Sequence, residues 1–135
     1  ATMTSSLLVT IFLACVCLSL GGDPADSWLA YAIAPGSDIV TSVKATWIVP
    51  SEPTVDGGYP AFWFGIEPRP ALNLIQPILK WQGYGYSIFN EYYEWDTGYD
   101  FQSESHSVKA GDTIIASVTY SPSNNSYDMF IKCVD

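Results

Sequence analysis

The sequence predicts an all-β fold built from antiparallel strands. Hydrophobic residues make up 48% of the chain, aromatic residues 15% and charged residues only 14%, which is typical of a packed domain rich in strand-forming side chains. Short apolar segments alternate with clusters of Gly, Pro, Asn, Asp and Ser. Beyond residue 22, no long stretch keeps the 3.6-residue apolar period of a helix without a Gly or Pro. Many short strands joined by turns predict a sandwich or a barrel.

Each expected strand lies between two turn-rich segments. From Val43 to Val49, for example, apolar side chains alternate with Lys44 and Thr46, so one face is apolar and the other polar. The expected strands, in order, are Trp28–Ile33, Ser42–Val49, Ala61–Ile66, Leu74–Trp81, Ile88–Trp95, Ser105–Val108, Thr113–Tyr120 and Tyr127–Val134.

Three polar side chains stand among the aromatic residues of these segments: Glu67, Gln76 and Glu94. An unpaired buried polar group costs about 1–3 kcal/mol, so each of them needs solvent, a partner or a cleft. Alternation places Tyr92 and Glu94 on one face of their strand. A carboxylate beside an aromatic ring suits the wall of a groove, and we expect Glu94 to line one.

The first residues have the pattern of a secretory leader. An apolar run from Leu7 to Leu18 is followed by small residues that suit cleavage after Gly21. The run is shorter than the ~20 residues of a membrane span, although no basic residue precedes it and a retained anchor is the alternative. We therefore expect residues 1–21 to be a signal peptide, residues 22–135 to form a single domain, and the mature chain to be secreted without stable membrane insertion.

Loss of the leader would remove Cys15 and Cys17 and leave Cys133 alone in an oxidising compartment. Cys133 is then either a buried free thiol, or it pairs with a cysteine in a continuation beyond Asp135 or in another chain.

A candidate modification site lies in an expected loop. Asn124-Asn125-Ser126 is an N-glycosylation sequon, which a eukaryotic secretory pathway would recognise. We expect Asn124 to be glycosylated if the chain follows that route.

The charge balance excludes some classes of function. Five Lys and Arg residues against fourteen Asp and Glu give a net charge of −9. Nucleic acid is a poor partner, because neutralising phosphates requires clustered cations. His and Cys residues with metal-ligand spacing are absent, and we expect no metal and no cofactor. His106, the single histidine, is expected to be an ordinary strand residue.

Six short segments follow one another along most of the mature chain. They are Ser27-Trp28-Leu29-Ala30-Tyr31, Val43–Pro50 ending in Trp47-Ile48-Val49-Pro50, Trp63-Phe64-Gly65-Ile66-Glu67, Leu74-Ile75-Gln76, Tyr92-Tyr93-Glu94-Trp95 and Val108-Lys109-Ala110-Gly111-Asp112-Thr113-Ile114. In this order and spacing they resemble motifs of the glutamic peptidases, also called eqolisins (peptidase family G1/A4). Each motif alone is weak, and the resemblance rests on all six together.

The resemblance implies an antiparallel two-sheet β-sandwich of the concanavalin-like lectin and glucanase type, with a substrate groove on its concave sheet. It also implies acid endopeptidase chemistry, in which a Gln and a Glu share one water molecule. The Glu acts as general base and remains partly ionised in acid, where a histidine would be fully protonated. The neutral Gln amide orients the water and stabilises the oxyanion at any pH.

Gln76 matches the catalytic Gln of the family, and we expect it to be catalytic. Trp63, Glu67 and Glu94 match positions that line the substrate groove, and we expect Tyr92 to line it as well. Gln82, the other candidate glutamine, lies too close to the Tyr-Glu-Trp strand for this pattern.

Two departures from the family pattern affect the expected activity. Pro77 follows Gln76 where the family has Thr, and it removes a backbone N–H beside the oxyanion site. No Glu follows Glu104, so no residue matches the catalytic Glu of the family. Either the chain is a fragment or short isoform, incomplete at its C-terminus, or this member of the family has lost the catalytic pair. Loss of a general base lowers the rate by ~10²–10⁴-fold. We therefore expect a secreted glutamic-peptidase-like protein that is inactive or a poor protease.

Three functions follow as hypotheses. The first is a glutamic-peptidase homologue acting on polypeptide, and the second is a non-catalytic module that binds peptide or glycan. The third is a structural protein that self-assembles through exposed strand edges, with sheet edges or Cys133 joining the copies of a homo-oligomer.

Overall fold

The fold is that of a computed structural model, which describes residues 39–55, 57–68 and 72–135. The chain divides into two units, residues 1–35 and 36–135, and all described residues belong to the second. The expected leader and the expected strand Trp28–Ile33 lie outside the described residues. In the described part of the chain, no helix is long and apolar enough to cross a membrane.

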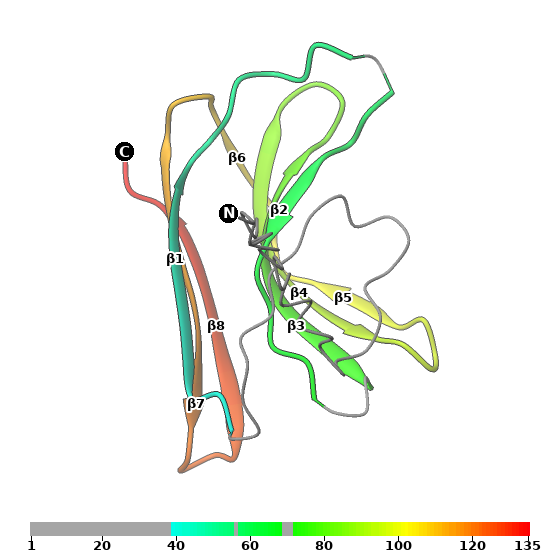
Figure 1. Cartoon of the computed structure of the whole chain (residues 1–135), viewed down its shortest axis with the longest axis vertical. Helices are drawn as coiled ribbons and strands as arrows, with labels where there is room; N and C mark the ends of the chain where they lie inside the picture. Colours follow the sequence, from blue (N-terminus) through cyan, green and yellow to red (C-terminus); the bar gives the residue numbers. More distant parts are fainter. Residues whose placement is uncertain (1–38, 56, 69–71) are drawn as a thin grey trace, which may run out of the picture. The chain divides into compact units, whose positions relative to one another are not determined.

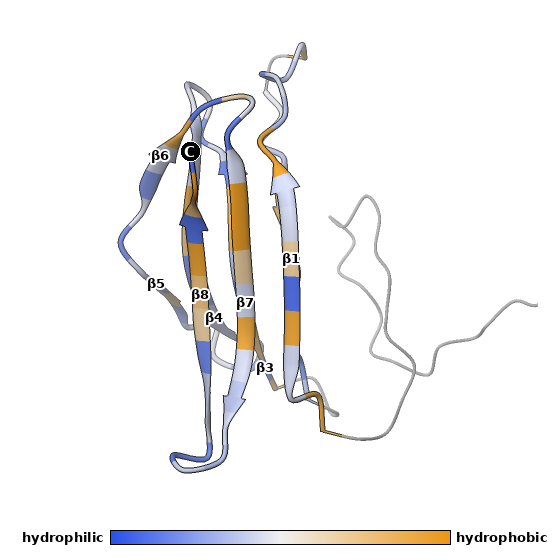
Figure 2. Ribbon diagram, turned by 90° about the vertical axis from the view of Figure 1, so that its left-hand side faces the viewer, coloured by the Kyte–Doolittle hydropathy of each residue, from blue (hydrophilic) through white to orange (hydrophobic). Residues whose placement is uncertain are grey.

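Within the described residues, eight strands form two antiparallel sheets (Figure 1). The first sheet has the order β1-β7-β8, and these strands lie side by side in Figure 2. Its strands are β1 (Ser42–Ile48), β7 (Thr113–Ser121) and β8 (Ser126–Cys133). The second sheet has the order β2-β3-β4-β5, and β6 also pairs with β4. Its strands are β2 (Ala61–Trp63), β3 (Asn73–Trp81), β4 (Tyr86–Glu94), β5 (Asp100–Gln102) and β6 (His106–Val108).

The main core lies between the two sheets. Leu79 of β3 and Ile114 of β7 are fully buried, and both belong to the main cluster of buried apolar side chains. Burial of each such side chain contributes roughly 1.5–3 kcal/mol, so this cluster fixes which face of each strand points inward. Asn90 of β4 also donates a side-chain hydrogen bond across the sandwich to the carbonyl of Met129 in β8, at 3.5 Å.

A tight turn joins β3 to β4. The backbone N–H of Gln82 donates to the carbonyl of Gly85 at 2.8 Å, and Gly83 adopts a φ of 90°, which favours glycine. The turn sets the register of the hairpin, in which Trp81 lies opposite Tyr86 and Gln76 opposite Glu91. Register in a hairpin follows from turn type and loop length.

The expected all-β, two-sheet sandwich is confirmed, and the described residues contain no helix. Each expected strand from Ser42 onward is present, with ends that coincide or differ by at most three residues. One strand was not expected: β5, whose three residues are all exposed. Such a short, exposed segment lacks the apolar alternation that identifies a strand in a sequence.

Gly65 allows the segment after β2 to lie close against β3. A Cβ at this position would lie 2.7 Å from Leu74 Cδ1 and 2.9 Å from the carbonyl oxygen of Ile75. The backbone oxygen cannot rotate away, and it belongs to the bridge between Ile66 and Ile75. Glycine is therefore required here by close backbone approach.

We expect Gly65→Ala to lower the free energy of unfolding by about 1–3 kcal/mol, as overpacking does in a close-packed region. Urea denaturation measures this directly. Gly85→Ala is the matched control, because a Cβ at Gly85 meets no atom within 4 Å. Equal unfolding midpoints for the two variants would contradict the close-approach argument.

Candidate active site

Gln76 lies in the middle of β3 on the outer face of its sheet. We use "outer face" for the side of the β2-β3-β4-β5 sheet that points away from the main core. Leu79 and Trp81 point into the core, so side chains an odd number of residues away from them point outward. Registers across the sheet give the other members of this face. Among them are Trp63, Glu67, Glu91, Tyr93, Asp100 and Gln102.

The side chain of Gln76 is in direct contact with that of Glu91. Gln76 Nε2 donates a hydrogen bond to Glu91 Oε2, across the register pair that joins β3 to β4. Gln76 is only 6% exposed, and among the described residues its Oε1 has no hydrogen-bond partner. A buried acceptor without a donor costs about 1–3 kcal/mol. The Gln76 amide can therefore gain stability from a donor supplied by a bound molecule.

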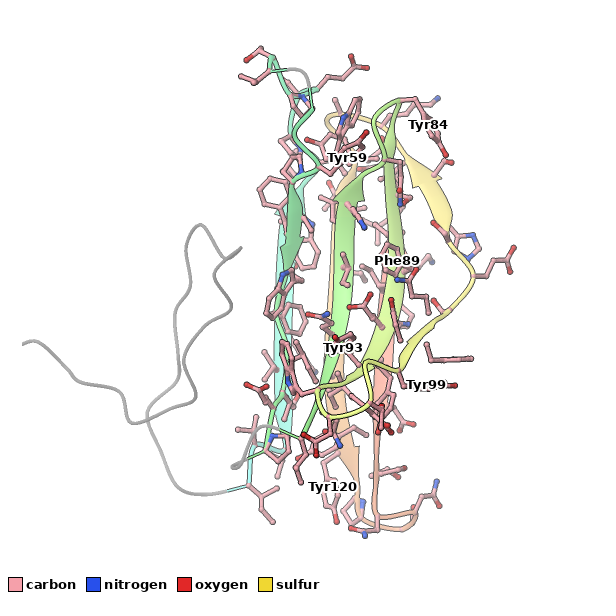
Figure 3. The ribbon with its side chains drawn as sticks, turned by 90° about the vertical axis from the view of Figure 1, so that its right-hand side faces the viewer. Tyr59, Tyr84, Phe89, Tyr93, Tyr99 and Tyr120 are labelled. Atoms are coloured by element: carbon pink, nitrogen blue, oxygen red, sulfur yellow. The ribbon has the colours of Figure 1, made fainter. Side chains whose placement is uncertain are left out.

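A second amide reaches Glu91 from β5. Gln102 Nε2 donates to Glu91 Oε1 at 2.9 Å and to Asp100 Oδ2 at 3.1 Å. Both carboxylate oxygens of Glu91 therefore accept a hydrogen bond from a neutral amide. The result is a continuous chain of side chains, Gln76–Glu91–Gln102–Asp100, across three adjacent strands of the outer face. Figure 3 is viewed toward this sheet and labels Phe89 and Tyr93, which flank Glu91 two residues away on each side in β4.

The surroundings of Glu91 raise its pKa above the ordinary glutamate value. Partial burial is the largest cause, because it disfavours the charged form, and the negative charge of Asp100 acts in the same direction. The hydrogen bonds from Gln76 and Gln102 and the positive charge of Lys80 lower the pKa and partly offset this rise. Glu91 therefore keeps its proton to a higher pH than an ordinary glutamate does.

Glu67 and Trp63 also lie on the outer face. Glu67 Oε1 accepts a hydrogen bond from the indole of Trp95, whose ring packs edge-on against Tyr93 with the ring centroids 4.9 Å apart. Trp63 lines an apolar pocket of about 400 Å³ between β1 and β2, together with Phe62 and Phe64. That these positions touch a substrate stays a prediction.

Tyr92 and Glu94 do not come together with Gln76. Both lie an odd number of residues from Glu91 along β4 and so belong to the opposite face of the sheet. We had expected them to line the same groove as Gln76. Glu94 instead holds the turn that follows β4. Its carboxylate accepts hydrogen bonds from the Tyr92 hydroxyl at 2.8 Å and from Thr97 Oγ1 at 2.9 Å. These bonds lower the pKa of Glu94, and the bond to Glu94 raises the pKa of the Tyr92 phenol.

The sequence did not identify Glu91, Gln102 or Asp100 as site residues. Glu91 could have been predicted from the sequence. Trp81 and Tyr86 flank the turn at Gln82–Gly85, and counting five residues from each along its strand places Glu91 opposite Gln76. Gln102 and Asp100 could not have been predicted, because they reach Glu91 only through the pairing of β5 with β4, and the sequence does not indicate that β5 is a strand.

The remaining candidate residues lie away from this site. Asn124 is exposed in the turn between β7 and β8, where glycosylation stays a prediction. Cys133 is a half-buried free thiol that packs against the main core, and its role in pairing is likewise untested. His106 is exposed in β6. No group of three metal-ligating side chains occurs in the described ranges.

The molecule is thus a two-sheet β protein with an amide and a carboxylate in contact on one sheet. Residues 28–132 match the Peptidase A4 family, and the chain belongs to this family. The match confirms the resemblance to the glutamic peptidases that the sequence motifs indicate. No curated protein and no solved structure matched the chain.

The raised pKa of Glu91 has a measurable effect on stability. Between the ordinary and the raised pKa, the folded chain binds more protons at Glu91 than the unfolded chain, so the free energy of unfolding falls as pH rises through that window. Glu91→Gln removes this titration. We therefore expect the stability of the wild type, relative to that of Glu91→Gln, to decrease from acidic to neutral pH.

Urea denaturation of both proteins across a pH series tests this expectation. Glu104→Gln is the control for loss of one negative charge, because Glu104 is exposed in the loop between β5 and β6. A stability difference between wild type and Glu91→Gln that stays constant with pH would show that the pKa of Glu91 is ordinary.

Proposed function

We propose that this protein hydrolyses peptide bonds in acid, with Gln76 and Glu91 as the reacting pair on the outer face. The single observation that carries the proposal is the hydrogen bond between these two side chains. Membership of the Peptidase A4 family supports the peptidase class. On sequence grounds we expected no base for the reaction, and Glu91 is the carboxylate that the fold sets beside Gln76.

The chemistry follows from the donors and acceptors of the pair. Water donates one hydrogen bond to the unpaired Oε1 of Gln76 and the other to the Glu91 carboxylate. Glu91 removes a proton as the water oxygen attacks the carbonyl carbon of the peptide bond. One N–H of Gln76 donates to Glu91, and its second N–H is free to stabilise the oxyanion that forms. Glu91 then returns its proton to the leaving amine as the C–N bond breaks.

The substrate that suits this face is an extended polypeptide. A peptide in extended conformation points every second side chain to the same side, as β3 and β4 do, so such a chain would lie along these strands with alternate side chains toward the face. Aromatic and acidic side chains, Trp63, Glu67 and Tyr93, extend the face on both sides of the reacting pair. We also propose that the protein acts outside the cell, on the support of the leader-like sequence in residues 1–21.

A second candidate function is peptide binding without cleavage. It is favoured by the hydrogen bonds that already occupy both oxygens of Glu91. A carboxylate held in this way stabilises the sheet whether or not it reacts. Binding alone would use the same outer face and the same class of partner.

We expect Gln76→Ala and Glu91→Gln each to lower kcat for peptide cleavage by about 10²–10⁴-fold. Because the two residues act as a unit, the kcat of the double variant should be close to that of the less active single variant. Cleavage of a fluorogenic peptide library between pH 2.5 and 5.5 measures the rates. Glu104→Gln is the control.

The same proteins and peptides distinguish peptide cleavage from peptide binding without cleavage. A wild type that binds peptide in calorimetry but shows no cleavage supports the binding function. Cleavage by Glu91→Gln at the wild-type rate removes Glu91 from the mechanism.

A further inference from the structure

We propose that Gln102 and Asp100 of β5 are positioning residues that hold the Glu91 carboxylate in the orientation in which it faces Gln76. The role in catalysis rests on the proposed function, whereas the positioning itself concerns only this chain. Gln102 lies opposite Glu91 in the β4–β5 register, and Asp100 lies two residues away on the same face. Neither residue belongs to a motif of the peptidase resemblance.

The amide of Gln102 acts as a bridge between two carboxylates. Its two N–H groups reach Glu91 Oε1 at 2.9 Å and Asp100 Oδ2 at 3.1 Å. An amide NH₂ has two donors, so it can bind one oxygen from each acid at the same time. Without this bridge, two negative charges on neighbouring strands would repel and Glu91 could rotate away from Gln76.

The bridge also fixes the orientation of the Glu91 carboxylate, because each of its two oxygens accepts a hydrogen bond from a different strand. Gln102 holds Oε1, and Gln76 holds Oε2. Rotation of the Glu91 carboxylate is therefore restricted from both sides of β4. A base that is already oriented avoids the cost of ordering during the reaction.

Four groups act on the charge of Glu91, and two of them are on β5. From β3, Gln76 and Lys80 favour the charged form, and from β5 Gln102 also favours it. Asp100 opposes it through its own negative charge. Gln102 and Asp100 therefore have effects of opposite sign on the same carboxyl group.

The opposite signs give a sharp test. The pKa of Glu91 is measured in the full chain by NMR titration of its side-chain carboxyl carbon. We expect Gln102→Ala to move the midpoint to higher pH, because a hydrogen bond to the charged form is lost. We expect Asp100→Asn to move it to lower pH, because a repelling charge is lost while an acceptor for Gln102 remains. Each displacement is expected to be about 0.2–0.7 of a pH unit, as for partly exposed charge interactions.

Asp128→Asn is the charge-matched control. Asp128 is exposed in β8 of the other sheet, and its loss removes the same charge without touching the bridge. We expect the midpoint of Glu91 to stay within the error of the wild-type value. Displacements of the same sign in Gln102→Ala and Asp100→Asn, or no displacement in either, would overturn the proposal.

Activity then separates this proposal from the proposed function. If the protein cleaves peptides, the acid limb of kcat/KM should move in the same two directions, since the reaction needs the ionised base. If the titrations move as expected but no variant cleaves, the positioning is correct and the peptidase function is wrong. If the protein cleaves peptides but the titrations do not move, the peptidase function stands and the positioning is wrong.

Discussion

The register between β3 and β4 is the constraint on which the site depends. It sets Gln76 opposite Glu91, and two independent features fix it. The turn at Gln82–Gly85 determines the pairing at one end, and the burial of Leu79 and Ile88 determines which face points inward. Because side chains alternate, a slip of one residue would move Gln76 into the core and Leu79 to the outer face. The packing that stabilises the sandwich therefore also places the candidate chemistry.

The outer face shows how a sheet can join polar groups that are far apart in sequence. Gln76, Glu91 and Gln102 come from three strands, and each hydrogen bond between them crosses a register pair. Adjacent strands place opposite side chains about 5 Å apart, so side-chain amides and carboxylates can bridge the gap. The backbone hydrogen bonds of the sheet thus fix the distance between opposite residues, and the type of side chain at each position determines which groups meet there. Gln102, for example, contacts Glu91 directly because the register sets the two residues opposite each other.

Alternation and turn residues were enough to predict the sandwich and most of its strands, because burial acts on every second residue. Gln76 was identified by its motif. The Tyr-Tyr-Glu-Trp motif predicts Glu94, and not Glu91, as the acidic residue of the groove. Alternation along the strand nevertheless puts these two acids on opposite faces of the sheet. Counting along both strands from the turn at Gln82–Gly85 places Glu91, and not Glu94, opposite Gln76. The three exposed residues of β5 carry no apolar pattern, so Gln102 and Asp100 could not be predicted.

The hydrogen-bond donors around Glu91 differ from those around an ordinary ion-paired carboxylate. A structural acid that is partly buried is ordinarily paired with Lys or Arg, which lowers its pKa and keeps it charged. Here the hydrogen bonds to Glu91 come from neutral amides, and burial together with Asp100 raises the pKa. Neutral donors hold the carboxylate in place without adding a positive charge that would lower its pKa further. The two amides orient the carboxylate, which serves the proposed general-base role, while the raised pKa moves the ionised form that this role needs to higher pH.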